Sequence, residues 1–555
     1  MSKLCRIATP LAGAALSLAA PLPALASPDA PWLLGAETKL LPPDPVASDR
    51  SGEAVATDGE WVVVGAPRHD HGGFGEFGAV YVYRKTAGGL TLDAELLPNV
   101  LKHNQWFGNS VHVDGDTIVV GAHGDDGLCP SSNFCDSGAV YVFVHNGTAW
   151  SLQAKLTPSD LESSDRFGSA VRIQGDTLFA SSVGDRDAGS GTGSAYVFTR
   201  SGGAWSETQK LLASDLARRS NFGASLAVDD DVLVVGAPLD DHGSATSADL
   251  GAAYVFRNHG GTWAEEVKLR PSDIHGGMEA GHSVSVMGDL VLIGAPGAHS
   301  PLTRAGAAYV FERVSSTWTE RQKLVDAFPL QQDHFGSSAC LLGDSLVVGS
   351  APELSGAGSV TAFCRTSTGW DSFTRITGSD SNPGDQFGVT AQISSDSLVI
   401  GANWHTQLGG VNVAGAAYVY DVQLIFRPYC DALPNSTGLP ATLTGAGTTS
   451  LSANDFVLST TGMPANATAV IIYGAGQAQV PLGSGRLCIS GALHRVYPPG
   501  ASNAGGTFVR AIDYASLPSQ GAISAGSTWN FQAWFRDTAP GGFNLSSGLQ
   551  VRFLN

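Results

Sequence analysis

Charged residues are scarce in this chain of 555 residues. Lys, Arg, Asp and Glu make up 15% of it, and 31 basic residues stand against 50 acidic ones, which gives a formal net charge of -19. So acidic a chain has no excess of basic side chains with which to hold nucleic acid or an anionic membrane surface by charge. We therefore expect no nucleic acid among its partners.

Long apolar runs are missing beyond the N-terminus, so we expect no membrane span. The chain opens with MSKLCRIATPLAGAALSLAAPLPALAS, where Lys3 and Arg6 precede a short apolar run and Ala24-Leu25-Ala26 resembles a cleavage site. Residues 1–26 are predicted to be a removed secretory signal peptide, with a membrane anchor as the alternative. Its removal would take the formal charge from -19 to -21, because Lys3 and Arg6 leave with it. The mature protein is expected to be secreted, either extracellular or at the cell surface.

Common catalytic signatures are absent too. The sequence has no H-E-x-x-H pair, no G-x-S-x-G elbow and no P-loop, and GHSVS at Gly281 belongs to a repeated hairpin. We assign no catalytic residues and predict that the protein is not an enzyme. A hydrolase or lyase remains an alternative, which would require residues such as His71, His123 and His242 to face one cavity.

Cysteine is also rare, and six of the seven cysteines remain once the predicted signal is removed. An even number in an oxidising compartment permits disulfides. We predict two, each between cysteines of the same region: Cys129–Cys135 and Cys430–Cys488. Cys340 and Cys364 are expected to keep their thiols and to be buried, because their strands are not expected to be neighbours.

Glycine is plentiful, with 69 residues, and a balance rich in Gly, Val, Thr, Ser and Ala favours strands and tight turns over helices. One stretch recurs along the chain: FGNSVHVDGDTIVVGA from Phe107, FGSAVRIQGDTLFASS from Phe167 and FGASLAVDDDVLVVGAP from Phe222. Alignment gives seven copies. Their marker glycines are Gly52, Gly108, Gly168, Gly223, Gly281, Gly336 and Gly388.

Each copy predicts four strands. An alternating strand (NSVHVDG) leads through a tight turn to an apolar strand (TIVVGA), and after a variable loop come a third strand (GAVYVF) and a fourth that ends in Lys-Leu (WSLQAKL). Four antiparallel strands repeated seven times predict an all-β fold, a seven-bladed β-propeller. The second strand is apolar on both faces, as expected for a strand with a blade on each side.

The ends of the repeat region predict how the ring closes. The last copy, Gly388 to Tyr420, has no Lys-Leu strand after it, whereas WLLGAETKL at Trp32–Leu40 precedes the first copy. We therefore expect the N-terminal strand to complete the last blade. The propeller is predicted to span residues 32–424 and to be a monomer.

The stretches FGNSVHV…VVGA and GAPLDDHG resemble the FG-GAP repeats of the integrin α-subunit N-terminal β-propeller and of its bacterial secreted relatives. The resemblance covers residues 32–424, with departures at Ser51-Gly52, Ala280-Gly281 and Ser181-Ser182. Many repeats of that family carry an Asp-rich calcium loop in the hairpin. The turns here, such as Asp114-Gly115-Asp116, are too short to supply the roughly six to eight oxygens that calcium takes. We therefore predict no metal ligands and no cofactor, and the family's calcium role is not carried over.

From Pro428 the repeat stops. Residues 428–555 are rich in Thr, Ser and Gly and contain alternating stretches such as TAVIIYGAG and TWNFQAWFRD. They predict a small C-terminal domain resembling a β-sandwich.

Polar residues gather in the loops of one propeller face, because the loop after Gly-Ala shares a face with the loop that joins two blades. The candidate ligand-face residues after Gly-Ala are Asp70, His71, Asp125, Asp126, Asp185, Asp187, Asp240, Asp241 and His242, and His69, His299 and His405 lie in the same loops. The joining loops add Asp160, Asp165, Asp215, Asp273, Asp333, Asp380 and Asp385. These residues either satisfy turn amides and keep the surface soluble, or form a surface for a ligand or cation.

The sequence thus predicts a secreted, non-catalytic binding or adhesion module that presents ligand-binding loops to an unknown extracellular protein or glycan. The alternatives are a structural extracellular scaffold and a propeller-based hydrolase or lyase.

Overall fold

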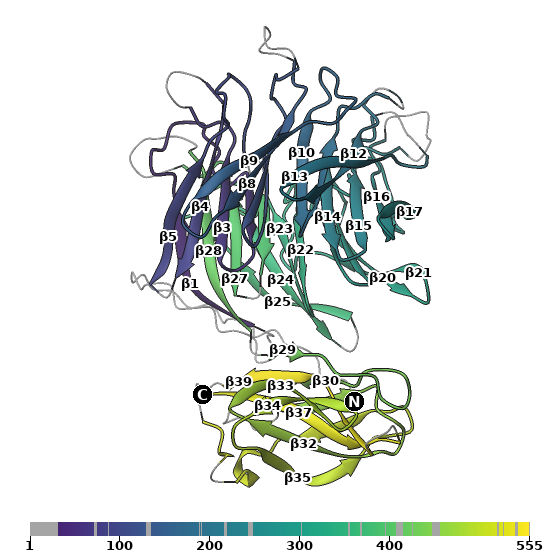
Figure 1. Cartoon of the computed structure of the whole chain (residues 1–555). Coiled ribbons are helices and arrows are strands. Elements are labelled where there is room, and N and C mark those ends of the chain that lie inside the picture. The colour runs from purple at the N-terminus through teal and green to yellow at the C-terminus, as the bar shows by residue number, and fades with distance from the viewer. Residues whose placement is uncertain are drawn as a thin grey trace. The chain divides into compact units, whose positions relative to one another are not determined.

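The computed structural model describes residues 32–553 except for 71–74, 87, 129–134, 188, 190, 216–218, 242–247, 301, 353–355, 367–368, 395, 407–413, 425, 447–455, 519–520, 525–526 and 539–541. The predicted signal peptide therefore lies outside the described residues. The chain divides into two compact units, residues 35–422 and a unit that contains residues 423–555. Within the described residues, the regular elements are strands apart from one 3-10 turn at Tyr514–Ser516 (Figure 1). None of these elements is a helix that could reach across a membrane.

Residues 35–422, together with the first residues of strand β1, form seven antiparallel four-stranded sheets. Sheet 1 holds β2 (Ala54–Thr57), β3 (Trp61–Ala66), β4 (Ala79–Thr86) and β5 (Gly89–Leu96). Sheet 2 holds β6 (Ser110–Asp114), β7 (Thr117–Ala122), β8 (Ala139–His145) and β9 (Trp150–Leu156). Sheet 3 holds β10 (Phe167–Gln174), β11 (Thr177–Ser182), β12 (Ser194–Ser201) and β13 (Ala204–Leu211).

The remaining sheets continue in chain order. Sheet 4 holds β14 (Ser225–Asp229), β15 (Val232–Ala237), β16 (Ala252–His259) and β17 (Thr262–Leu269). Sheet 5 holds β18 (Ser283–Met287), β19 (Leu290–Ala295), β20 (Ala307–Val314) and β21 (Thr317–Leu324). Sheet 6 holds β22 (Phe335–Leu342), β23 (Ser345–Ser350), β24 (Ser359–Thr366) and β25 (Gly369–Ile376).

Sheet 7 is assembled from both ends of this region. It holds β26 (Thr390–Ile393), β27 (Ser397–Ala402) and β28 (Ala416–Leu424), and its fourth strand is β1 (Trp32–Leu40), which pairs with β28. The prediction that Trp32–Leu40 completes the last four-stranded unit is confirmed. The first strands of the sheets also contact one another in chain order, and β26 contacts β2. This all-β arrangement of seven blade-like sheets fits a β-propeller.

A cyclic series of backbone hydrogen bonds joins each sheet to the one before it. In sheet 2, the amide of Phe107 donates to the carbonyl of Phe77, which precedes β4 of sheet 1, at 2.9 Å. The same bond recurs at Phe167–Ser137, Phe222–Thr192, Ala280–Leu250, Phe335–Ala305 and Phe387–Ala357. At the last joint, Ser51 of sheet 1 donates to Ala414 before β28 at 2.9 Å, so the series returns to its start.

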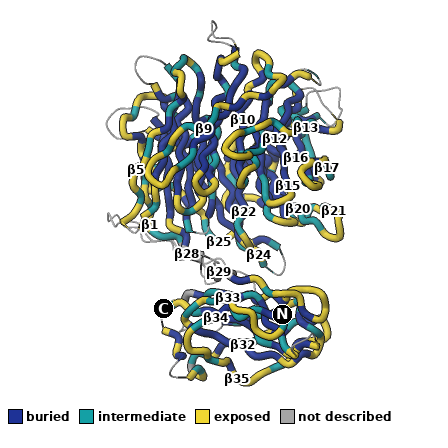
Figure 2. Tube along the Cα trace, in the orientation of Figure 1, coloured by how far each residue is buried: buried dark blue, intermediate teal, exposed yellow. Residues whose placement is uncertain are grey.

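The second strands lie in the interior of this unit. The side chains of β3, β7, β15, β19, β23 and β27 are buried along their whole length. The apolar clusters form between adjacent sheets: one of them packs Val63 and Val82 of sheet 1 against Val120 and Tyr141 of sheet 2. Figure 2 shows the same division, with buried inner strands and with exposed positions on outer strands such as β5 and in the connections. The apolar pattern of the second strand is therefore explained by packing on both faces.

Close contact between adjacent sheets requires the glycines of the repeat. A Cβ atom on Gly236, at the end of β15, would lie 2.0 Å from the carbonyl oxygen of Gly281, the marker glycine of sheet 5. The equivalent distance at Gly401 of sheet 7, to Gly52 of sheet 1, is 1.9 Å. Gly281 itself has a φ of +88°, a conformation that favours glycine. The small residues at both ends of the hairpin are thus explained by backbone contact.

Sheet 3 departs from this rule at Ser181, which stands where the other sheets have glycine. In sheets 2, 4, 5, 6 and 7 a first-strand hydroxyl such as Ser225 occupies the adjoining space and donates to the marker glycine of the next sheet, in this case Gly281, at 2.8 Å. In sheet 1 that first-strand position is Ala54. In sheet 3 that first-strand position is Ala170, and Ser181 Oγ accepts from the Ala170 amide at 3.0 Å. The hydroxyl has moved from the first strand to the second, which leaves room for the extra Cβ.

The C-terminal unit contains a six-stranded and a three-stranded sheet and a separate hairpin. The larger sheet holds β29 (Phe426–Cys430), β39 (Gly548–Arg552), β37 (Thr528–Arg536), β38 (Phe543–Leu545), β32 (Thr468–Gly474) and β35 (His494–Ala501). The smaller holds β30 (Thr442–Ala446), β31 (Val457–Thr461) and β36 (Phe508–Ala511), and the hairpin is β33 (Gly476–Leu482) with β34 (Gly485–Ser490). The main apolar cluster takes side chains from both sheets, including Leu458, Phe508, Ile471 and Phe531.

One of the two predicted disulfides is confirmed, Cys430–Cys488, whose Cα atoms are 6.0 Å apart. Cys135 is disulfide-bonded, but Cys129 lies outside the described residues, so that pairing stays a prediction. Cys340 is a buried thiol, as expected. The expectation that Cys364 is buried is wrong: it is half-buried, because it lies near the outer end of β24.

The exchange seen in sheet 3 yields a test of the packing rule. We expect Gly236→Ser to lower the free energy of unfolding by about 1–3 kcal/mol, because the new side chain overlaps Ser225 Oγ and the Gly281 carbonyl. The double variant Ser225→Ala/Gly236→Ser copies sheet 3 and should recover part of that loss in denaturant unfolding. A double variant no more stable than Gly236→Ser would contradict the compensation.

Candidate functional site

A lysine, a tyrosine and aspartates form a cluster that recurs from sheet to sheet. In sheet 4, Lys268 Nζ lies 2.8 Å from Asp240, in the loop after Gly-Ala, and 2.6 Å from Asp215, in the joining loop. The Tyr254 hydroxyl is within hydrogen-bond distance of both carboxylates. Tyr254 on β16 is paired in register with Lys268 on β17, which brings the two side chains together. The cluster ties two loops to the outer strands.

Four other sheets carry a version of this cluster. The lysine–carboxylate pairs are Lys155–Asp125 in sheet 2, Lys210 with Asp160, Asp185 and Asp187 in sheet 3, Lys323–Asp273 in sheet 5 and Lys39–Asp380 in sheet 7. In sheet 5, Ala298 stands at the position of Asp240, so one carboxylate is lost.

These aspartates are internal ion-pair partners. Asp125, Asp185 and Asp240 are 1%, 2% and 0% exposed. Burial by itself raises the pKa of Asp125, but the Lys155 ammonium and the hydrogen bonds from Lys155 and Tyr141 outweigh it and hold the pKa below its ordinary value. Burial, reinforced by the two carboxylates, raises the pKa of Tyr254, so that the phenol stays protonated. The carboxylate oxygens of these three residues are already engaged by lysine and tyrosine side chains.

Two more of the predicted ligand-face residues satisfy loop amides. Asp126 is 0% exposed, and its Oδ1 accepts from the amides of Cys135 and Asp136 at 2.7 and 2.9 Å. Asp241 Oδ1 accepts from two amides of its own loop at 2.7 and 2.8 Å. These contacts fit the first of the two interpretations, in which the aspartates serve the turns.

The other predicted residues divide into exposed and undescribed ones. Asp70 and Asp187 are exposed, although Asp70 accepts from the Glu76 amide at 2.6 Å. His71 and His242 lie outside the described residues. His123, the third histidine of the enzymatic alternative, packs edge-on against Trp106 with ring centroids 4.7 Å apart. Burial, with the charge of Arg166, lowers its pKa to about 4.

Sheets 1 and 7 carry a histidine where sheets 2, 3 and 4 have the buried aspartate. In sheet 7, His405 Nε2 lies 2.6 Å from Lys39 Nζ, and His405 Nδ1 lies 2.8 Å from Asp385. In sheet 1, His69 Nε2 lies 3.6 Å from Asp44 and its Nδ1 lies 3.3 Å from Asp49. His69 is completely buried. Both imidazoles therefore lie between carboxylates of the joining loop.

Sheet 1 also has Glu95 at the lysine position. Burial lowers the pKa of His69, but the hydrogen bond to Asp49 and the charges of Asp49, Asp44 and Glu95 outweigh burial and raise it. Asp44 and Glu95 are not among the residues predicted from the sequence. Alignment of the fourth strands would have revealed Glu95, since AEL at 94–96 stands where the other copies have Lys-Leu.

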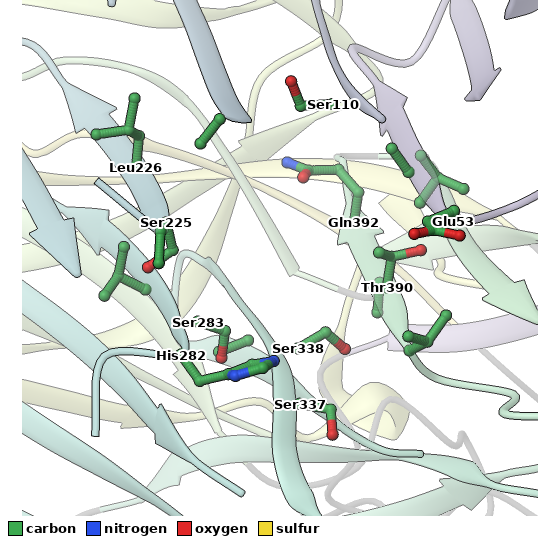
Figure 3. Close-up of a pocket in the computed structure, with 18 of the residues that line it drawn as sticks. Glu53, Ser110, Ser225, Leu226, His282, Ser283, Ser337, Ser338, Thr390 and Gln392 are labelled. Atoms are coloured by element: carbon green, nitrogen blue, oxygen red, sulfur yellow. The ribbon is translucent and has the colours of Figure 1, made fainter. Parts of the chain in front are cut away.

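A cavity of about 200 Å³ lies where the first strands of all seven sheets converge (Figure 3). Hydroxyls of its wall are used in the ring: Ser110, Ser225, Ser283, Ser338 and Thr390 each donate to the marker glycine of the following sheet. Other polar wall residues are Glu53, Asn109, Arg172, His282 and Gln392. Burial lowers the pKa of Arg172 and of His282. No sequence pattern pointed to this cavity.

The C-terminal unit has a larger groove of about 870 Å³ over β32, β35 and β37. Apolar and aromatic side chains line it, including Leu493, Tyr497 and Trp534, beside Arg495 and Arg536. Tyr497 is 64% exposed. The groove belongs to this unit alone and was not predicted from the sequence.

Comparison with known families agrees with the repeat geometry. A family model described as an FG-GAP repeat matches residues 34–83, 90–143, 150–198, 205–256, 263–311 and 370–420. The chain belongs to the FG-GAP repeat family. Each match runs from a fourth strand to the third strand of the following sheet, so the FG-GAP repeat is offset by one strand from the sheet. The copy with marker Gly336 is outside the matches, and in it Thr361 replaces the tyrosine of the cluster.

Solved structures are similar only at a distance. One of a protein from Lactobacillus plantarum is 14% identical, covers 65% of this chain and 99% of its own, and has a TM-score of 0.40. Another, of Chaetomium thermophilum Sqt1 bound to the N-terminus of the ribosomal protein L10, is 13% identical, covers 69% and 97%, and has a TM-score of 0.39. None of the curated proteins matches this chain.

The cluster of this FG-GAP protein makes a stability prediction. Asp125→Ala removes the buried partner of Lys155 and Tyr141, and we expect it to lower the free energy of unfolding by about 3 kcal/mol. Asp187→Ala, at an exposed carboxylate, should cost less than about 1 kcal/mol. Denaturant unfolding of the two variants measures both effects, and equal losses would argue against the internal role of Asp125.

A comparison of the wild type with Asp125→Ala also tests the lowered pKa of Asp125. A carboxylate whose pKa is lowered in the folded state stabilises fully above its ordinary value, 3.8 for Asp125, and loses that contribution as the pH falls through the folded value. The difference in stability between the wild type and Asp125→Ala should therefore shrink as the pH is taken below 3.8.

Proposed function

We propose that the protein is a secreted, non-catalytic binding module that uses one face of a closed, seven-bladed propeller to hold an extracellular protein. This face, called the loop face, consists of the loops after Gly-Ala, such as 123–137, and the joining loops, such as 157–166. A β-sandwich-like domain follows the propeller. The signal-like N-terminus and the disulfide Cys430–Cys488 support secretion, because disulfides persist in oxidising compartments.

Exposed apolar side chains on the loop face carry this proposal. Within the described part of residues 35–422, the exposed large apolar residues outside it are Leu92 and Val314. Those on the loop face are Leu41, Val46, Val100, Leu128, Leu302, Val325, Phe328, Leu330 and Trp404. Gathered exposed apolar residues mark interaction surfaces in soluble proteins. With its buried aspartates engaged internally, the loop face offers apolar contacts.

The densest part of the loop face lies at the joint between sheets 5 and 6. Val325, Phe328 and Leu330 are in one joining loop, and Leu302 is in the adjacent loop after Gly-Ala. Backbone bonds hold the two loops together, from Gln332 to Thr303 at 3.1 Å and between their neighbours 334 and 304 at 3.3 Å. Phe328 is 69% exposed. An aromatic anchor on loops held by a rigid scaffold lowers the ordering cost of binding.

A protein partner fits this surface better than a glycan does. Leu302, Val325 and Leu330 present aliphatic surface, which is stabilised by burial against another apolar surface. Protein interfaces place such residues at their centre with a polar rim. The partner is therefore expected to bring an apolar patch of its own.

Ring closure is testable by removing its last strand. Deletion of residues 32–40 would leave β28 as an exposed edge and remove Lys39 from its pair with Asp380. We expect aggregation or a large fall in melting temperature in calorimetry and light scattering. A truncated protein that remains monomeric with an unchanged melting temperature would refute closure by this strand.

The binding surface is testable by changing Phe328. The full-length protein is used to capture partners from the extracellular fraction of its source, and affinity for the main captured protein is then measured. Phe328→Ser should weaken binding about 30-fold, the effect of losing about 2 kcal/mol at a central anchor, with the melting temperature unchanged. The matched control is Val314→Ser, at another exposed apolar residue, which should bind as the wild type does. Equal affinity of both variants, or glycan-array binding that is indifferent to Phe328, would exclude this surface.

A further inference from the structure

Sheet 1 differs from the other sheets at one position of the repeated cluster. In sheets 2 to 5 the cluster tyrosine is paired in register with a lysine, namely Lys155, Lys210, Lys268 and Lys323 in turn. In sheet 6 a threonine takes the place of the tyrosine, and Thr361 is paired with Arg375. In sheet 7, Lys39 Nζ lies 5.5 Å from the centroid of the Tyr418 ring. The lysines of sheets 2 to 5 lie 5.0–5.6 Å from the ring centroids of the tyrosines in their own sheets. In sheet 1, the partner of Tyr81 is Glu95. The position is thus basic in six sheets and acidic in one.

The lysines mark where a cation sits in this cluster. Their Nζ atoms lie 2.6–2.8 Å from the carboxylates of the surrounding loops. Glu95 replaces that positive charge with a negative one, while Asp44 keeps the place of Asp160, Asp215 and Asp380. Among the ion pairs of the described residues, neither Asp44 nor Glu95 has a lysine or arginine partner. Three carboxylates, those of Asp44, Asp49 and Glu95, therefore surround the buried His69.

Sheet 7 provides the matched comparison. It has the same histidine, joining-loop aspartates and tyrosine as sheet 1, namely His405, Asp380, Asp385 and Tyr418. There Lys39 Nζ lies between His405 Nε2, at 2.6 Å, and Asp380 Oδ2, at 2.7 Å, while those two ligand atoms are 3.9 Å apart. In sheet 1 the corresponding atoms of His69 and Asp44 are 3.6 Å apart. The two sites differ at the position of the positive charge, which is Lys39 in sheet 7 and Glu95 in sheet 1.

We propose that a divalent transition-metal ion of the zinc class takes the place of the lysine ammonium in sheet 1, held by His69 Nε2, Asp44 and Glu95. One ligand atom from each of the three residues lies within 4.8 Å of the others. Two ligands on a tetrahedral zinc, each about 2.0 Å from it, are roughly 3.3 Å apart, close to the 3.6 Å between His69 Nε2 and Asp44 Oδ2. A small movement of the exposed Glu95 side chain toward the ion would bring the third ligand atom within bonding distance.

The ligand atoms, and the side chains that hold them in place, indicate which metal fits the site. An imidazole nitrogen with two carboxylates suits zinc and its neighbours, whereas calcium and magnesium take oxygen ligands. Asp49 lies 3.3 Å from His69 Nδ1, the position of the carboxylate that orients a metal-bound imidazole. The Tyr81 hydroxyl donates to Asp44 Oδ1 at 3.2 Å. Asp44 is 55% exposed, so water can reach the fourth position.

This site is unrelated to the hairpin turns in which the family's calcium loop would lie. It joins the loop before sheet 1 (Asp44), the loop after Gly-Ala (His69) and β5 (Glu95), the segments that correspond to those joined by Lys210, Lys268 and Lys39 in their sheets. A bound metal would thus hold sheet 1 as Lys268 holds sheet 4.

The test compares zinc binding by variants of the full-length protein. Chelator-treated wild type is titrated with Zn²⁺ by calorimetry and by competition with a chromophoric chelator. We expect the wild type to bind one more equivalent than Glu95→Lys, and its melting temperature to rise with Zn²⁺. Glu95→Lys restores the lysine of the other sheets, so it should fold and be at least as stable as the metal-free wild type. Asp93→Lys, an exposed change of the same charge on β5, should bind as the wild type does.

A further variant and the treatment of background binding make the test decisive. Glu95→Gln removes a carboxylate with little change in shape and should weaken the extra site at least about 10-fold, which covers the case in which Glu95→Lys fails to fold. Other imidazoles, such as the stacked pair His275 and His299, contribute equally to every variant. Equal stoichiometry and affinity in the wild type, Glu95→Lys and Glu95→Gln would overturn the proposal. Saturable binding of Ca²⁺ at this site in place of Zn²⁺ would overturn the assignment to the zinc class.

Discussion

Contact between the backbones of adjacent sheets is the constraint on which the rest of this structure depends. Where the glycine of Gly-Ala meets the marker glycine of the next sheet, as at Gly236 and Gly281, a Cβ would approach a carbonyl oxygen to 2.0 Å. That closeness accompanies the amide-to-carbonyl series from each sheet to the next. In five of the seven sheets it also accompanies a hydroxyl bond to the next sheet. Sheet 3 indicates that the constraint is spatial, because it has Ala170 on the first strand and carries the hydroxyl on Ser181 of the second.

The charged clusters form a second layer of connections farther from the cavity. Each lysine near the end of a fourth strand pairs with a loop carboxylate, and Lys210 and Lys268 pair with carboxylates from two loops. Acidic residues such as Asp125 and Asp240 thereby become internal partners. The loop face loses much of the acidity that its sequence suggests. What it exposes are apolar side chains such as Phe328, and these favour recognition of a protein surface over capture of a cation by scattered aspartates.

Differences between repeats show where one copy has acquired its own chemistry. Replacement of a buried aspartate by histidine occurs in sheets 1 and 7, next to each other in the ring. In sheet 7 lysine is retained, and the histidine has an ammonium and a carboxylate as neighbours. In sheet 1 Glu95 stands in place of lysine, and Asp44, His69 and Glu95 bring together the atoms of the proposed metal site. The repeats act as internal controls for one another.

The sequence by itself determined the seven repeats, the order of their four strands and the pairing of Trp32–Leu40 with the last sheet, because these follow from periodicity and from counting strands at the two ends. It also indicated Cys430–Cys488, since both cysteines lie in one region. Only the tertiary structure decided that Asp125 and Asp240 are buried, because residue type does not reveal which way a loop side chain turns. It alone brought Asp44, His69 and Glu95 together, because they come from three separate segments and meet through the packing of one sheet.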